Sequence, residues 1–143
     1  MTVDFGLTSC TTASIVATTA QITCTLAKKP TAGDWNVKVS DPKGLIPTAT
    51  ALVKINVPLV ITSISPNKAF NQLGGDIMQV TGTGYNPDKA KNSVIFSDNT
   101  ECTALAVTET QLDCVINGFD QNNILSQYPT KVKVITENAA FVE

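Results

Sequence analysis

Residues 74–86 read GGDIMQVTGTGYN, a short apolar run enclosed by four glycines. A phosphate-binding loop needs a strand, a glycine turn and then a helix whose amino end faces the anion. Here NPDK follows at 86–89 and another apolar run begins soon after, so no such helix is expected. We therefore interpret the glycines as the boundaries of a β-strand, where one pair supplies a turn with positive φ and the other permits a bend or bulge. These structural turn residues are Gly74, Gly75, Gly82 and Gly84.

Short runs of alternating apolar and polar residues recur along the rest of the chain, and none shows the sustained 3.6-residue period of an amphipathic helix. Turn residues separate these runs, as at Asn117-Gly118 and Tyr128-Pro129. The 20 threonines, together with many valines and isoleucines, suit a pleated, half-buried surface. The pattern predicts an all-β sandwich fold. The expected strands lie within 3–7, 21–26, 35–39, 51–57, 77–81, 94–97, 111–116 and 130–135.

The sequence also contains an internal repeat, and such a repeat indicates that the chain is built from related structural units. Four short segments recur in the same order after about ninety residues. The pairs are VDFG at 3–6 with VIFS at 94–97, Cys10 with Cys102, QITC at 21–24 with QLDC at 111–114, and VKV at 37–39 with VKV at 132–134. The chain is therefore expected to contain two related units.

The repeat is out of register with the ends of the chain. Residues 59–93 precede the second copy of the repeat and have no counterpart before the first, whereas ALVKINV at 51–57 would map beyond Glu143. We therefore expect residues 1–58 to be the C-terminal part of one sandwich. Residues 59–143 are expected to form a nearly complete sandwich that lacks its last strand.

The four cysteines also fall into two close pairs, one in each half. Neither pair has the two-residue spacing of zinc knuckles or redox motifs. We predict a disulfide within each half, which implies an oxidising, extracellular compartment; four reduced, buried thiols are the alternative. Closing loops of this length contributes about 3 kcal/mol each in the chain-entropy model. The predicted bonds join Cys10 to Cys24 and Cys102 to Cys114.

Composition excludes several classes of function. The formal net charge is -2, which does not suit a nucleic-acid binder. All ten basic residues are lysines and the chain has no histidine, so a Ser-His-Asp triad, a His-ligated metal and an arginine clamp are all missing. No run of 18 apolar residues suggests a membrane span. We predict a non-enzymatic protein without cofactor or metal that binds no nucleic acid.

The order of these motifs resembles the IPT/TIG domain, an immunoglobulin-like module found in plexins, in related growth-factor receptors and in many secreted microbial repeat proteins. The family pattern is I-x-x-I-x-P, then Gly-Gly before a strand ending in G-x-G-F, then two cysteines flanking a hairpin. Tyr85 stands where Phe is usual and Ala69 where Gly is common. The resemblance implies immunoglobulin-like sandwiches in tandem. The matching residues are Ile61, Ile64, Pro66, Gly74, Gly75, Gly82, Gly84, Cys102 and Cys114.

Several other residues have a structural and a functional interpretation. The single tryptophan is expected to fill the core between two sheets, and a sugar-stacking platform is the alternative. No spaced calcium-loop motif connects the aspartates Asp34, Asp41, Asp98, Asp113 and Asp120, so we expect them in solvated turns. The expected core residues are Trp35, Val37, Val80, Phe96 and Val132.

An unfinished sandwich exposes strand edges and an apolar face, which invite another chain to pair there. The missing strands would come from upstream in the same polypeptide or from a neighbouring subunit by strand addition. We expect an extracellular or cell-surface structural or adhesive module that builds a rod or filament, with copies of itself or adjacent repeats as partners.

The alternative function is a receptor-like ectodomain whose loops bind a protein or carbohydrate near aromatic residues such as Tyr85 and Phe119. The threonine-rich stretches TTASIVATTA and PTAT suit O-linked sugars in a secreted protein, and strand propensity alone is the other explanation.

Overall fold

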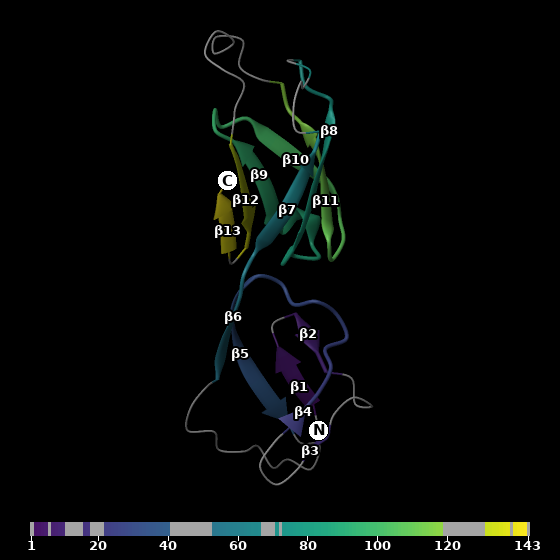
Figure 1. The fold of residues 1–143 in the computed structure, drawn as a ribbon, viewed down its shortest axis with the longest axis vertical. Helices are drawn as coiled ribbons and strands as arrows, with labels where there is room; N and C mark the ends of the chain where they lie inside the picture. The colour runs from purple at the N-terminus through teal and green to yellow at the C-terminus, as the bar shows by residue number, and fades with distance from the viewer. Residues whose placement is uncertain are drawn as a thin grey trace.

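The computed structural model describes residues 2–5, 7–10, 16–17, 22–40, 53–66, 71, 73–118, 131–137 and 139–142. Within these ranges the regular secondary structure is almost entirely β-strand, as the alternating pattern predicted. Figure 1 shows two bodies stacked along the long axis, which we call the first unit (strands β1 to β6) and the second unit (strands β7 to β13). No helix in the described ranges is long and apolar enough to cross a membrane.

The second unit is a sandwich made by one folded sheet with the strand order β13-β12-β9-β10-β11-β8-β7. Strands β9 and β10 share only two residue pairs, where the sheet turns from the three-stranded layer into the four-stranded layer. Layers of three and four antiparallel strands are the arrangement of an immunoglobulin-like sandwich. The strands are β7 (Val60–Ser65), β8 (Ile77–Thr83), β9 (Asn92–Phe96), β10 (Glu101–Val107), β11 (Gln111–Ile116), β12 (Val132–Thr136) and β13 (Ala139–Val142).

The core of the second unit lies between its two layers. Alternation produces it directly: along β8 every second residue is buried, and the same is true of β9 and β11. Met78 and Val80 from β8 are completely buried, as are Val94 from β9 and Leu112 from β11. Full burial of each such side chain contributes roughly 1.5–3 kcal/mol relative to exposure.

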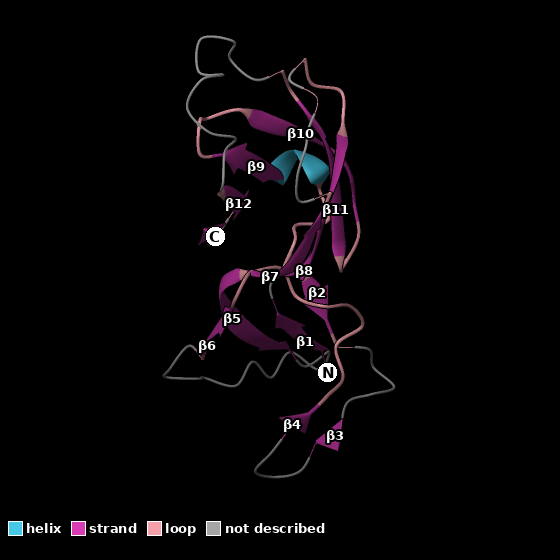
Figure 2. Cartoon of the chain, turned by 45° about the horizontal axis from the view of Figure 1, so that its top comes forward, coloured by secondary structure: helices cyan, strands magenta, loops and turns pink. Residues whose placement is uncertain are grey.

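The described residues of the first unit form a less complete sandwich. A four-stranded sheet has the order β2-β1-β5-β6, and the hairpin of β3 and β4 is a separate two-stranded sheet. Figure 2 shows this hairpin apart from the larger sheet. The strands are β1 (Thr2–Phe5), β2 (Thr8–Ser9), β3 (Val16–Ala17), β4 (Ile22–Thr23), β5 (Gly33–Ser40) and β6 (Lys54–Val57).

The sequence repeat coincides with a repeat of strand pairing. Strand β1 pairs with β5 as β9 pairs with β12: Val3 lies opposite Val39, and the corresponding Val94 lies opposite Val134. The hairpins agree as well, because the β3–β4 and β10–β11 pairings lie ninety residues apart position by position. Strands β7 and β8 have no counterpart among the described residues of the first unit.

One prediction about the second unit is wrong. The sequence repeat predicted that the last strand lies beyond Glu143, but β13 lies within the chain and pairs with β12 along Lys133–Thr136. The physical reason is the length of the connection. Thr136 already lies opposite Ala139 in a tight turn, whereas a long segment separates β5 from β6 in the first unit. Aligning the two units by residue number therefore placed the expected last strand too far toward the C-terminus.

Candidate functional site

The two units meet at a contact built from the loop before β5, the linker after β6 and the chain that leaves β8. We call this contact the joint. Its central residue is Ala32, whose backbone N–H donates to the carbonyl oxygen of Gly84 at 2.8 Å. Ala32 is completely buried and packs within the hydrophobic core of the second unit, although it belongs to the first. One unit therefore contributes a side chain to the core of the other.

Gly84 is the residue that lets the two backbones approach. Its φ of 99° lies in the left-handed region that favours glycine. A Cβ atom at this position would lie 2.9 Å from the Cβ of Ala32 and 3.0 Å from the carbonyl oxygen of Pro58. Any side chain at Gly84 would therefore collide with the preceding unit or with the linker.

Tyr85 closes the joint from the side of the second unit. Its side chain is 5% exposed, and its hydroxyl donates to the carbonyl oxygen of Val80 at 3.0 Å. Gly82 leaves room for that hydroxyl, because a Cβ there would lie 2.8 Å from the Tyr85 Oη. Burial raises the pKa of Tyr85 to about 12, since the phenolate would lose its hydration.

The loop on the side of the first unit is held by Trp35. The indole N–H donates to the carbonyl oxygen of Thr31 at 2.7 Å, and Thr31 itself is 3% exposed. Trp35 is half-buried. Its polar edge is therefore engaged in shaping the joint.

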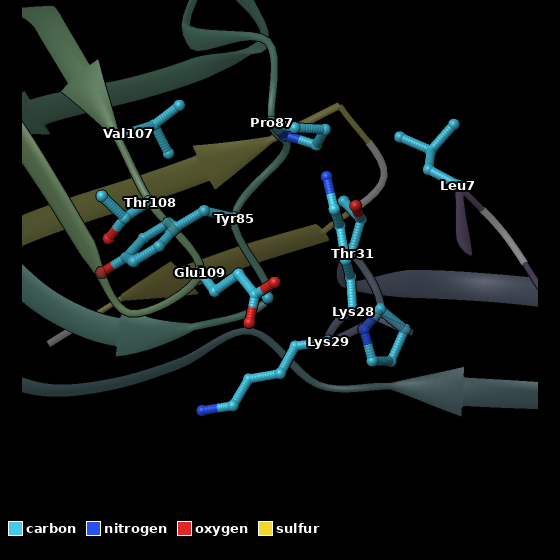
Figure 3. Close-up of a pocket in the computed structure, with 11 residues that line it drawn as sticks. Leu7, Lys28, Lys29, Thr31, Tyr85, Pro87, Val107, Thr108 and Glu109 are labelled. Carbon is cyan, nitrogen blue, oxygen red and sulfur yellow. The ribbon is translucent and has the colours of Figure 1, made fainter. Parts of the chain in front are cut away.

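A cavity of about 260 Å³ opens beside the joint. In Figure 3, Tyr85, Thr108 and Glu109 lie on one side of it, and Thr31, Lys28 and Leu7 come from the first unit. Its charged side chains are exposed, and it contains no nucleophile paired with a base. Among the described residues no cluster of metal-binding side chains occurs. The cavity thus resembles a gap between two docked surfaces.

A polar network fixes the chain that follows Tyr85. The buried Asn86 and Asn92 bind each other through side chain and backbone, with Asn92 Oδ1 accepting from the Asn86 N–H at 2.9 Å. Asn86 also donates to Glu137, which forms an ion pair with Lys91 at 2.9 Å. Asp88 caps the short 3-10 helix η2 (Lys89–Lys91). These bonds tie the loop of the joint to the turn between β12 and β13.

The predicted disulfides are both present, Cys10–Cys24 in the first unit and Cys102–Cys114 in the second. The predicted turn and core residues lie as follows. Positive φ angles occur at Gly74 and Gly75, and Pro66 follows β7. Val80 and Phe96 are buried in the core of the second unit with Val132 packed against it, and Val37 is half-buried in the first unit with Trp35.

Three of the five aspartates form local hydrogen bonds. Asp34 accepts from Asn56, Asp98 from Thr100, and Asp113 from Gln111. The expectation of solvated turns is wrong for two of them, because Asp34 lies on β5 and Asp113 on β11, whereas Asp98 lies in the β9–β10 turn. The other two, Asp41 and Asp120, lie outside the described residues, as do Phe119 and most of the threonine-rich stretches.

The joint residues of the first unit were not predicted from the sequence. They carry no alternation and no chemistry of their own, so only packing reveals their role. The one available signal was the run of small residues, PTAG at 30–33, directly before a strand. Small residues permit a close approach of two backbones, as they do here.

The open edge of the first unit is its second notable feature. In the second unit, β11 pairs on one side with β10 and on the other with β8. Its counterpart β4 pairs with β3, and no described strand lies on its other side. The apolar residues behind this edge are incompletely covered: Cys24, Leu26 and Val39 are half-buried, whereas the corresponding Cys114, Ile116 and Val134 are at most 1% exposed.

Comparison with known proteins gives one family match. Residues 59–142, more than half of the chain, match the model of the IPT/TIG domain. A comparison with curated proteins returned no match. Among solved structures, the chain is similar to a crystal structure of a structural genomics protein of unknown function from Bacteroides thetaiotaomicron VPI-5482, with 22% identity and a TM-score of 0.48. That alignment covers 62% of this chain and 20% of the other.

Proposed function

Because this chain belongs to the IPT/TIG domain family, we propose that it is a non-enzymatic structural or adhesive repeat of an extracellular rod or filament. The joint is the observation on which this proposal chiefly rests. It joins two units end to end through buried residues, and an end-to-end contact that is repeated produces an extended assembly. The partners are adjacent repeats or copies of the same chain.

The open edge of the first unit supports the same proposal. A strand equivalent to β8 would pair with β4, and one equivalent to β7 would pair with that strand, so that together they cover the half-buried apolar residues behind the edge. We propose that they come from outside residues 1–143, either from a preceding repeat of the same polypeptide or from a neighbouring subunit by strand addition. Domains 1–58 and 59–143 are then successive members of an array.

The two disulfides support an extracellular or cell-surface location, because such bonds persist in oxidising compartments. Mass spectrometry of the unreduced protein from its native source would show both bonds intact. Four free thiols would contradict this location. The same spectra would reveal sugars on the threonine-rich stretches, which remain a prediction.

The assembly is tested by electron microscopy of the native material and by sedimentation of the 143-residue chain. We expect extended particles in micrographs, and self-association of the chain in sedimentation, because no described strand of the first unit covers the free side of β4. The substitution Val39→Lys places a charge on the uncovered face and should reduce association. Lys38→Glu changes the opposite, exposed face of the same strand and serves as the matched control.

Compact single particles in native material would contradict the rod. A chain that stays monomeric at all concentrations would contradict the open edge, and so would equal association of the two variants. The two results are separable, since a rod made only of covalently linked repeats needs no association between chains.

A further inference from the structure

The joint has the features of a contact that selects its occupant by size. On the side of the second unit, Ala32 lies against Gly84, and it belongs to the buried cluster that also contains Leu59 and Tyr85. Thr31 and Gly33 on either side of it are buried as well. A side chain longer than a methyl group at position 32 would have to displace the core of the second unit.

We propose that Ala32 and Gly84 form a size-selective joint that holds the two units in one fixed orientation. The second unit presents a socket, formed by Leu59, Gly84 and Tyr85, and its occupant is the small-residue loop at 30–33 of the unit that precedes it. The kind of partner that fits this socket is therefore another sandwich of the same type, which inserts the loop before its β5 equivalent. This inference concerns the chain alone, so it goes beyond the proposed rod and can stand without it.

The linker agrees with a fixed orientation. Only Pro58 and Leu59 separate β6 from β7, and proline restricts its own φ. Leu59 is 7% exposed and packs in the core of the second unit, whereas flexible linkers are rich in glycine and serine and remain solvated. The linker and the loop thus anchor the first unit to the second at two separate points.

The hydrogen bond across the joint supplies a direct measurement. The amide of Ala32 belongs to the first unit and its acceptor, the Gly84 carbonyl, to the second, so protection of this amide from hydrogen exchange reports docking. Trp35 supplies another measurement, because the only tryptophan in the chain binds the carbonyl of Thr31. Its emission should change when the loop at 30–33 leaves the socket.

The experiment compares the 143-residue chain with the variants Ala32→Leu and Ala27→Leu. Both add the same three carbons to the same loop, but Ala27 is exposed. We expect a protected amide at position 32 in the unsubstituted chain. Ala32→Leu should lower that protection by about tenfold or more and shift the emission of Trp35, whereas Ala27→Leu should change neither. Amides in β8 and β11 should keep their protection in both variants.

Two outcomes would overturn the joint. The first is rapid exchange of the Ala32 amide in the unsubstituted chain, which would mean that the units are not docked. The second is unchanged protection and emission in Ala32→Leu. If Ala32→Leu instead exposes the amides of β8 and β11, the small-angle scattering of the unsubstituted chain decides: a single rigid shape supports the joint and a distribution of orientations refutes it. Failure here would leave native rods intact in micrographs.

Discussion

The two units pair their strands in the same register, yet they bury their equivalent residues to different degrees. Val94 and Val134 of the second unit are at most 1% exposed. The equivalent Val3 is 8% exposed and Val39 is half-buried. The difference lies in β7 and β8, which exist only in the second unit among the described residues and place Met78 and Val80 over the core.

This difference separates strand pairing from core formation. In the first unit, residues 2–5 pair with residues 37–40 although the described residues there form no complete second layer. The second unit shows that full burial needs that layer. Each half-buried side chain contributes only part of the roughly 1.5–3 kcal/mol of stabilisation that full burial provides. The first unit should therefore depend on strands supplied from outside the described residues.

The largest loss of stability is expected when a buried side chain of β8 is removed from the second unit. Met78→Ala leaves a cavity where a completely buried side chain was, and should lower the free energy of unfolding of the second unit by about 2–5 kcal/mol. Ile77→Ala, the neighbour on the outward face of β8 and 55% exposed, is the control and should cost under about 1 kcal/mol. Chemical denaturation monitored by hydrogen exchange in β11 would measure both. Equal losses would show that β8 does not supply the core.

Alkaline pH should destabilise the second unit through Tyr85. The pKa of this phenol is about 12 in the folded protein and about 10 when unfolded, so the unfolded state releases its proton first as pH rises. Stability is therefore complete below pH 10 and falls between pH 10 and 12, by about 2–3 kcal/mol in total. Tyr85→Phe should remove this dependence while costing about 1 kcal/mol at pH 7. Parallel pH profiles for the two proteins would refute the assignment, since the lysines titrate in both.

The same substitution at equivalent positions of the two units should cost them different amounts of stability. Val134→Ala removes a side chain that is 1% exposed, and should cost the second unit about 2 kcal/mol. Val39→Ala in the half-covered first unit should cost about 1 kcal/mol. Hydrogen exchange of amides in β12 and β5 would report each unit separately. A larger loss at Val39 would mean that the first unit is better covered than the described residues show.

The smallest effect is expected at the ion pair between Lys91 and Glu137. Their side chains are 45% and 44% exposed, and such surface pairs contribute about 0–1 kcal/mol. Lys91→Met should therefore shift the thermal midpoint only slightly, and less still in high salt. A large, salt-independent loss would show that the pair has a greater share in fixing the loop after Tyr85.

Much of the architecture could be predicted from the chain itself. Alternation identified the strands that contain Met78, Phe96 and Cys114, and the repeat anticipated that the VKV segments have equivalent partners. Alternation failed for β10, where a bulge between Ala104 and Ala106 interrupts the period. It also missed β13, because this short strand follows a tight turn and its counterpart in the first unit follows a long segment.

The sequence by itself predicted most of the described strands, the cysteine partners and the repeat, because each can be recognised from period, spacing and residue type along the chain. The tertiary structure alone decided which apolar faces are covered and where the two units touch. Nothing in the residues around Ala32 indicates its role. The role comes from Gly84, more than fifty residues away, whose backbone contacts Ala32. The burial of a side chain depends on residues that are distant in the sequence, and a local hydrophobic period contains no information about them.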